Sequence, residues 1–439
     1  MEAKTIKSID RAHMLHSWSV QSQLDPMVFD RGEGSCLWDA DGNRYLDFSS
    51  QLINLSIGHQ HPHVVKAIQK WAEKCCYINP AYAYESRSLL LEKLVGITPD
   101  KINHFFLTLS GAESNENAIK MARLYTGKSK IIARYRSYHG GSMGASALTG
   151  DPRRWAAEPS VPGIVRVFDP YCYRCSFGLE YPSCNLQCAE NVREVMEYEG
   201  AKNHVAAMIV EGVTGTNGLF VPPDGYYQRI REICDEFEVL LICDEVMSGF
   251  GRTGKWFSFE NWGIQPDIIT MAKGITSGYM PLGCVAVSDK IAEYFQDNML
   301  WCGLTYNNHP LACGAAVACI EVIEKENLLR QSVDLGKICK IELEKLKEKH
   351  KCVGDVRGIG LFSMIELVKD KNTKEPLTPF NTNNDLVKAV VRMLKERGLL
   401  TVMHWHKIFV TPPLVITEEE LREGLAIIDE VLSWVDSQI

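Results

Sequence analysis

The sequence predicts an α/β fold, with a large domain built on a mostly parallel sheet between helices and a smaller α/β domain after it. The chain has 439 residues, of which 46% are hydrophobic, and can therefore bury enough core for two domains. Short apolar runs at residues 239–243 and 268–272 are bounded by polar residues, as buried parallel strands are. Helical and strand patterns alternate over residues 325–439, which predicts the second, smaller domain.

Local patterns predict the individual elements in chain order. Alternating apolar residues around an Asp-Gly turn predict a β-hairpin over residues 33–49. A helix is expected from about Pro62 to Cys75, and Thr417 is expected to cap a helix over residues 418–434. Further strands are expected at residues 105–109, 131–135 and 205–210, and further helices at residues 226–236, 311–324 and 384–396.

The composition narrows the classes of partner and compartment. A formal net charge of −8 gives no electrostatic reason to expect nucleic acid or an anionic membrane as a partner. No apolar run approaches the length that spans a bilayer, and no signal-like segment opens the chain, so a cytoplasmic protein is expected. The 15 cysteines are spread along a large chain and are expected to be mostly reduced thiols.

Two polar residues stand at the ends of neighbouring predicted strands. Asp244 follows the run 239–243, and Lys273 follows the run 268–272. Open α/β sheets bind ligands at the carboxyl ends of their strands. A carboxylate that faces a pyridinium nitrogen and a lysine that forms a Schiff base are the groups that pyridoxal 5'-phosphate (PLP) requires. Taken singly, Asp244 is more simply a strand-end cap and Lys273 a solvated surface residue; the pair has the groups of a PLP site, and the motifs around it decide between the two interpretations.

The surrounding motifs resemble the class III PLP-dependent aminotransferases. The ordered series is Asp244-Glu245-Val246, Gly-Phe-Gly-Arg-Thr-Gly at residues 249–254, Pro-Asp, Ala-Lys-Gly around Lys273, and Gly-Tyr-x-Pro-Leu-Gly at residues 278–283. The resemblance extends from about Gly32 to Pro413. It implies fold type I, with a seven-stranded sheet in the large domain. The implied division is an N-terminal arm with part of the small domain (1–55), a large PLP-binding domain (56–320) and a C-terminal small domain (321–439).

A glycine-containing turn opens the helix that follows the strand at residues 105–109. Free N–H groups at a helix N-terminus bind phosphate, so Ser110, Gly111 and Ala112 are expected to hold the phosphate of PLP; an ordinary helix cap is the alternative. The resemblance implies further cofactor contacts, with Tyr138 and Val246 on the two ring faces, His139 orienting the turn, Glu211 near O3′, and Thr305 reaching the phosphate of a neighbouring subunit.

The resemblance is strongest to the taurine and ω-amino acid:pyruvate branch. It implies a ping-pong transaminase in which Lys273 is the Schiff-base lysine, an ω-amino acid or amine is the donor, and a 2-oxo acid, pyruvate, is the acceptor. Where many pyruvate-using relatives carry an arginine for the substrate carboxylate, this chain has Val402. His404, His406, Lys407 or Arg87 could supply a cation in place of that arginine, and Ile53 stands where amine-type relatives often carry a tryptophan. With Trp18, these are the candidate residues for the substrate pocket. The sequence does not decide between pyruvate and 2-oxoglutarate.

Two stretches raise the question of a metal. His59, His61 and His63 precede a helix, and turn and capping roles are favoured for them over a metal site. Cys172, Cys175, Cys184 and Cys188 lie in an insertion with the spacing Cys-x2-Cys-x8-Cys-x3-Cys. Four thiolates could hold a structural zinc, but the spacing matches no finger or ribbon, so free thiols are the default expectation.

Other functions share the same core motifs. A PLP-dependent aminomutase, racemase or decarboxylase of this fold would also need Asp244 and Lys273, and net amino transfer to a keto acid would separate it from a transaminase. A non-catalytic homologue is the third possibility, and the intact pair of residues argues against it. The shared active site implies a homodimer; a homotetramer stays open.

Overall fold

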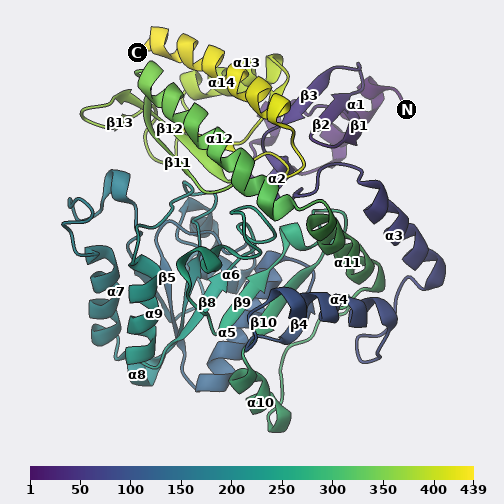
Figure 1. Ribbon diagram of the computed structural model, residues 1–439, viewed down its shortest axis with the longest axis vertical. Coiled ribbons are helices and arrows are strands. Elements are labelled where there is room, and N and C mark those ends of the chain that lie inside the picture. The colour runs from purple at the N-terminus through teal and green to yellow at the C-terminus, as the bar shows by residue number, and fades with distance from the viewer.

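The computed structural model describes residues 1–439, and its centre is a mixed sheet of seven strands (Figure 1). The strand order is β4-β10-β9-β8-β7-β5-β6, and only β10 runs antiparallel to its neighbours. The predicted mostly parallel sheet of seven strands is confirmed. Its strands are β4 (His104–Thr108), β5 (Lys130–Arg134), β6 (Ile164–Val167), β7 (Val205–Glu211), β8 (Leu240–Asp244), β9 (Ile268–Met271) and β10 (Gly283–Val287).

Helices cover both faces of this sheet, because its strands β7, β8 and β10 are buried along their whole length and need apolar cover on each side. Helix α5 has a cap at each end. The Ser110 side chain accepts a hydrogen bond from the Glu113 N–H at its start, and Gly127 takes a left-handed conformation at its end. The helices of this part are α3 (Pro62–Lys74), α4 (Glu85–Ile97), α5 (Gly111–Thr126), α6 (Met143–Leu148), α7 (Gln187–Tyr198), α8 (Ala201–His204), α9 (Tyr226–Glu236), α10 (Asp289–Asp297) and α11 (Pro310–Lys325).

A second, five-stranded sheet packs with the C-terminal helices above the large sheet in Figure 1. It contains β11 (Val353–Gly358), β12 (Ser363–Asp370), β13 (Glu375–Pro376), β15 (Met403–His404) and β16 (Lys407–Val410). The helices are α12 (Leu328–Lys349), α13 (Asp385–Glu396) and α14 (Glu418–Gln438). Thr417 caps α14 as expected, in a reciprocal capping box with Glu420.

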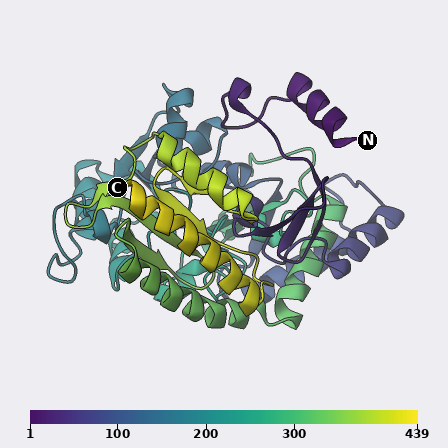
Figure 2. The same cartoon turned by 90° about the horizontal axis from the view of Figure 1, so that it is seen from above.

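The N-terminal hairpin joins this C-terminal part. The expected hairpin forms from β2 (Cys36–Asp39) and β3 (Arg44–Asp47), with β1 (Phe29–Glu33) on one side and β14 (Leu399–Leu400) pairing parallel to β3 on the other. A short α2 (Ser50–Ile53) follows. The first helix, α1 (Ala3–His13), has no buried residue and lies at the edge of the molecule (Figure 2). The domain boundaries at residues 55 and 320 stay a prediction.

The sheet topology determines where polar residues can meet. Strands β5, β7, β8 and β9 are parallel neighbours, so the residues that follow them gather at one edge of the sheet. The two largest apolar clusters lie on the faces of this sheet and in the C-terminal part, and they leave this edge to polar groups. None of the helices combines the length and apolarity needed to cross a bilayer.

Candidate active site

A cavity of about 560 Å³ lies at this edge, between the strand ends and the C-terminal part. Asp244 and Lys273 both line it, together with Gly111 at the start of α5. Segments far apart in the sequence close the cavity, including Leu52 near the N-terminus and Trp405 in the turn between β15 and β16. The predicted meeting of the two strand-end residues in one hollow is therefore observed.

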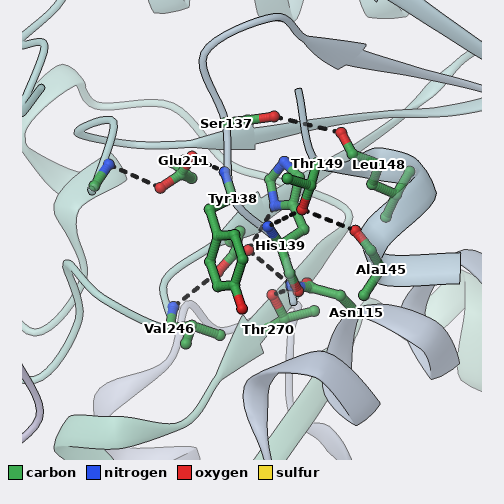
Figure 3. A network of polar contacts seen from close by, with 12 residues as sticks. Asn115, Ser137, Tyr138, His139, Ala145, Leu148, Thr149, Glu211, Val246 and Thr270 are labelled. Carbon is green, nitrogen blue, oxygen red and sulfur yellow. Dashed lines mark hydrogen bonds and ion pairs between the residues drawn. The ribbon is translucent and has the colours of Figure 1, made fainter. Parts of the chain in front are cut away.

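Buried hydrogen bonds fix the Asp244 carboxylate in place. Figure 3 labels the residues that form this network around it, His139, Asn115, Val246 and Thr270. His139 Nδ1 lies 2.7 Å from Asp244 Oδ2, and Asn115 Nδ2 donates to the same oxygen at 2.8 Å. The other oxygen accepts from the Val246 N–H at 3.0 Å. Asn115 is fixed in turn, because Thr270 Oγ1 donates to its Oδ1 at 2.7 Å. Since these groups are buried, the carboxylate has one orientation.

Lys273 follows β9 in a left-handed backbone conformation with φ of 46°, which is uncommon for a residue with a side chain. Such conformations are found at functional sites that the surrounding structure holds in place. Burial lowers the pKa of the Lys273 amine to about 8, and the nearby carboxylates Asp244 and Glu211 oppose this shift. A lysine with a lowered pKa is partly neutral near pH 8 and can act as a nucleophile.

The start of α5 reaches the cavity with Gly111 and Ala112, whereas the Ser110 side chain is used to cap the helix. A Cβ atom at Gly111 would lie 2.6 Å from Val246 Cγ1, so glycine lets the helix start close to the wall of the cavity. The open N–H groups of the first turn, together with the helix dipole, form an anion site there. The hydroxyl of Ser110 as a phosphate ligand stays a prediction.

Tyr138 and Glu211 form another part of the cavity wall. The Tyr138 N–H donates to Glu211 Oε1 at 3.1 Å, and Glu211 Oε2 accepts from the Gly215 N–H at 2.8 Å. Burial raises the pKa of the Glu211 carboxyl. Both residues line the cavity, as predicted from the motifs, and so do His139 and Val246.

Arg153 is the site residue that the sequence did not indicate. Its guanidinium carbon lies 3.6 Å from the centre of the Tyr138 ring, and the side chain lines the cavity. Asp151 binds it, with Arg153 Nε 2.9 Å from Asp151 Oδ2. Besides Lys273, Arg153 is the only lysine or arginine on the cavity wall. No spacing signal in the sequence identifies it, because it lies in a short 3₁₀ segment after α6.

Three of the residues predicted for the substrate pocket line the cavity, namely Trp18, Ile53 and His404. Val402, which stands where relatives carry an arginine, lines it too. His404 is not a cation near neutral pH, because burial, and next the charge of Arg153, lower its pKa to about 4. Its predicted role as a positive group is therefore wrong.

The predictions that Arg87, His406 and Lys407 line this cavity are wrong. Arg87 borders a separate hollow and donates to the carbonyls of Pro80 and Tyr82. His406 and Lys407 belong to the hairpin of β15 and β16 and lie beside the buried carboxylate of Glu366.

The predicted metal alternatives find no support. No group of three or more His, Cys, Asp or Glu side chains is arranged to hold a metal ion, so the zinc hypothesis for Cys172, Cys175, Cys184 and Cys188 is not supported. All four are free thiols. His59 and His61, which precede α3, and His63, in its first turn, have carboxylate partners instead, namely Asp47, Glu326 and Glu321 in that order.

The cavity has the groups that PLP needs. It combines an anion site at the start of α5, a carboxylate held by buried donors, a lysine with a lowered pKa, and an aromatic ring at Tyr138. The residues present therefore fit the cofactor that the motifs imply.

Comparison with known proteins points in the same direction. The sequence matches the family model Aminotransferase class-III over residues 18–432. It is 37% identical to a leucine/methionine racemase of Thermococcus litoralis, over 94% of this chain and 91% of the relative. It is 35% identical to a taurine–pyruvate aminotransferase of Bilophila wadsworthia, over 98% and 97%. The solved taurine:2-oxoglutarate aminotransferase of Bifidobacterium kashiwanohense, in complex with PLP and glutamate, superposes with a TM-score of 0.96 at 41% identity, over 100% and 99% of the two chains.

Proposed function

Since the chain belongs to the class III aminotransferases, we propose that it transfers the amino group of an ω-amino acid with an anionic tail, taurine or β-alanine, to pyruvate. Members of this family are PLP-dependent enzymes, and the protein is accordingly an enzyme of the aminotransferase type with PLP as its cofactor. When bound, PLP supplies an electron sink for the carbon that carries the amino group.

The chain's own residues take these roles in the proposal. Lys273 Nζ would hold the cofactor and, with the substrate amine bound, would move the proton at the substrate carbon. Asp244 holds a proton at the pyridine nitrogen, and His139 and Asn115 keep its carboxylate in position. Tyr138 and Val246 line the cavity and would enclose the ring of the bound cofactor.

The position of Arg153 is the observation that supports an anionic substrate. The guanidinium lies on the cavity wall, with its carbon 3.6 Å from the centre of the Tyr138 ring and 5.9 Å from the centre of the Trp18 ring. A guanidinium binds carboxylate and sulfonate groups by charge and by paired hydrogen bonds. A donor with an amine at one end and a negative tail at the other could place the amine at Lys273 and the tail at Arg153, since both residues line the cavity.

The presence of only one arginine on the cavity wall also favours pyruvate as the acceptor. Pyruvate carries one carboxylate, whereas 2-oxoglutarate carries two and would need a second positive group. Val402 offers none, and burial leaves His404 uncharged near neutral pH. The Bilophila relative is named for taurine and pyruvate, and the solved relative for taurine and 2-oxoglutarate.

The test is to give the PLP-loaded enzyme taurine or β-alanine with each acceptor and to measure alanine or glutamate. Arg153→Gln should lower kcat/KM for β-alanine about 10- to 100-fold relative to β-alaninamide, whose tail is neutral, because a charged hydrogen bond contributes about 1.5–3 kcal/mol. Arg154→Gln is the matched control, since Arg154 binds Glu158 and the Gly150 carbonyl instead. An Arg153→Gln enzyme that keeps the wild-type ratio would contradict the proposal.

A racemase is the second candidate, and the 37% identity to the leucine/methionine racemase favours it. Its reaction needs no keto acid. Incubation of the PLP-loaded enzyme with L-leucine alone, followed by chiral chromatography, decides between the two. Formation of D-leucine without any acceptor would support the racemase, and amino transfer that requires pyruvate would support the transaminase.

We further propose a homodimer with shared active sites. Thr305 is absent from the cavity of its own chain, and its carbonyl accepts from Tyr77 Oη at 2.8 Å on the surface. Near it in the sequence, Met299, Trp301 and Tyr306 are exposed by 66%, 70% and 57%. Large exposed apolar side chains are typical of a protein interface.

Co-expression tests this arrangement. Lys273→Ala and Thr305→Ala are each defective as pure dimers, but a mixed dimer would contain one intact site, so activity should return in the mixed sample. Light scattering gives the mass and separates dimer from tetramer. A fully active monomer would exclude shared sites.

A further inference from the structure

The substrate-facing arginine is itself held by a buried carboxylate that no motif in the sequence marks. Asp151 is 3% exposed, and it precedes the 3₁₀ segment that carries Arg153. Its Oδ1 accepts from the Arg153 backbone N–H at 2.9 Å and from Arg153 Nε at 3.1 Å, and its Oδ2 accepts from Nε at 2.9 Å and from the Nη2 atom. One carboxylate therefore occupies one edge of the guanidinium.

The loop that follows β7 supports the same pair. Thr216 Oγ1 accepts from Arg153 Nη2 at 2.7 Å, and Asn217 Nδ2 donates to Asp151 Oδ2 at 3.1 Å. Arg153 Nη1 forms no hydrogen bond or ion pair within the chain, so it keeps donors for a ligand. The contacts fix how the guanidinium lies over the Tyr138 ring.

Hydrogen bonds hold the residues on either side of Thr216 and Asn217 in the loop. The Gly215 N–H donates to Glu211, and Arg357 Nε from the small domain donates to the Gly218 carbonyl at 2.7 Å. A side chain at Gly212, which precedes this loop, would collide with Ser258, and the hydrogen bonds of Gly215 and Gly218 hold the loop in place.

We propose that Asp151 is a positioning residue for the substrate: it holds Arg153 so that the Nη1 end of the guanidinium faces the negative tail of the amino donor. This inference rests on the proposed function and adds a residue to it. Asp151 itself does not touch the substrate. The negative charge of Asp151 by itself would repel the negative tail of the substrate and weaken its binding. By holding Arg153 in place, the same carboxylate would strengthen that binding, so the two effects have opposite signs.

These opposite signs make the proposal testable. If Asp151 positions Arg153, Asp151→Ala should lower the ratio of kcat/KM for β-alanine to that for β-alaninamide about tenfold, through KM. Asp151→Asn keeps the shape and one acceptor oxygen, so it should lower the ratio only about threefold. If Asp151 only screens the charge, both variants would raise the ratio, and the proposal would be overturned.

A binding measurement without turnover complements the kinetics. The affinity of the PLP-loaded enzyme for propanoate, which has the tail of β-alanine but no amine, is measured by calorimetry. The expected order of affinity is wild type, Asp151→Asn, Asp151→Ala; an unchanged affinity in Asp151→Ala would also overturn the proposal. Glu158→Gln, at a surface partner of Arg154, is the control for nearby charge loss.

The outcomes separate this inference from the function on which it depends. If Arg153→Gln leaves the ratio of the two donors unchanged, the proposed anionic substrate is wrong. If Arg153→Gln lowers the ratio while Asp151→Ala does not, the substrate stands and the positioning role of Asp151 is wrong. Circular dichroism of each variant identifies a loss of folding. If Asp151→Ala does not fold, the ratio of the two donors in Asp151→Asn decides whether Asp151 positions Arg153.

Discussion

Replacing Asn115 by aspartate would place a second carboxylate against Asp244. Asn115 Nδ2 donates to Asp244 Oδ2 at 2.8 Å in a buried setting, so the two carboxylates of the variant would stand at that separation. Two unit charges about 3–4 Å apart repel by about 4–6 kcal/mol at an effective dielectric constant near 20. Since about 1.4 kcal/mol changes an equilibrium tenfold, one carboxyl of the pair would take up a proton at neutral pH.

The shared proton would reduce the negative charge that faces the cofactor nitrogen. A charged hydrogen bond contributes about 1.5–3 kcal/mol, so the single-turnover rate with β-alanine should fall about 10- to 100-fold, and PLP should bind more weakly. The rate should recover in part as the pH rises, because the shared proton is then lost. Stopped-flow absorbance over pH 6–10 measures both effects.

Asn117→Asp is the matched control on the same helix. Asn117 is buried, but its Nδ2 donates to the Glu113 carbonyl and it makes no contact with Asp244. An Asn115→Asp enzyme that stays within threefold of the wild-type rate, or that falls no further than Asn117→Asp, would refute the argument that buried donors hold Asp244 for catalysis.

Two further predictions concern other buried charges. Because the neutral amine of Lys273 is the nucleophile and its pKa is about 8, the rate of PLP uptake by cofactor-free protein should rise about tenfold per pH unit below pH 8 and level off above it; a flat rate between pH 6 and 9 would contradict this. Glu366→Gln should destabilise the protein by about 3–5 kcal/mol in urea unfolding, since it removes the buried carboxylate that pairs with the Arg174 guanidinium and, together with Asp355, with that of Arg357. Glu423→Gln, at a surface pair, should cost less than about 1 kcal/mol, and equal effects of the two variants would exclude this explanation.

The comparisons confirm the family, the fold class, the enzyme type and the cofactor that the motifs implied. The main reason is that the evidence for each was local in the chain. An apolar run followed by one polar residue predicts a buried strand and the residue at its end, so Asp244 and Lys273 could be recognised before their distance was known.

The substrate side of the cavity could not be predicted in the same way. His404, His406 and Lys407 lie in one short stretch, yet His404 borders the cavity while the other two lie at Glu366. The turn of the hairpin between β15 and β16 decides this, and the turn residue Trp405 has a left-handed φ of 57° that the sequence pattern does not reveal.

By itself, the sequence determined the strands, the helix start at Gly111 and the two residues that define the chemistry, because each depends on neighbours within a few positions. Only the tertiary structure decided that Arg153 faces the cavity, that Asn115 binds Asp244 and that Asp151 holds Arg153. Contacts such as those of Arg153 with Tyr138 and Thr216 join residues of separate loops. Whether such residues meet depends on how the layers pack, and packing energy is a property of the whole core rather than of any local pattern.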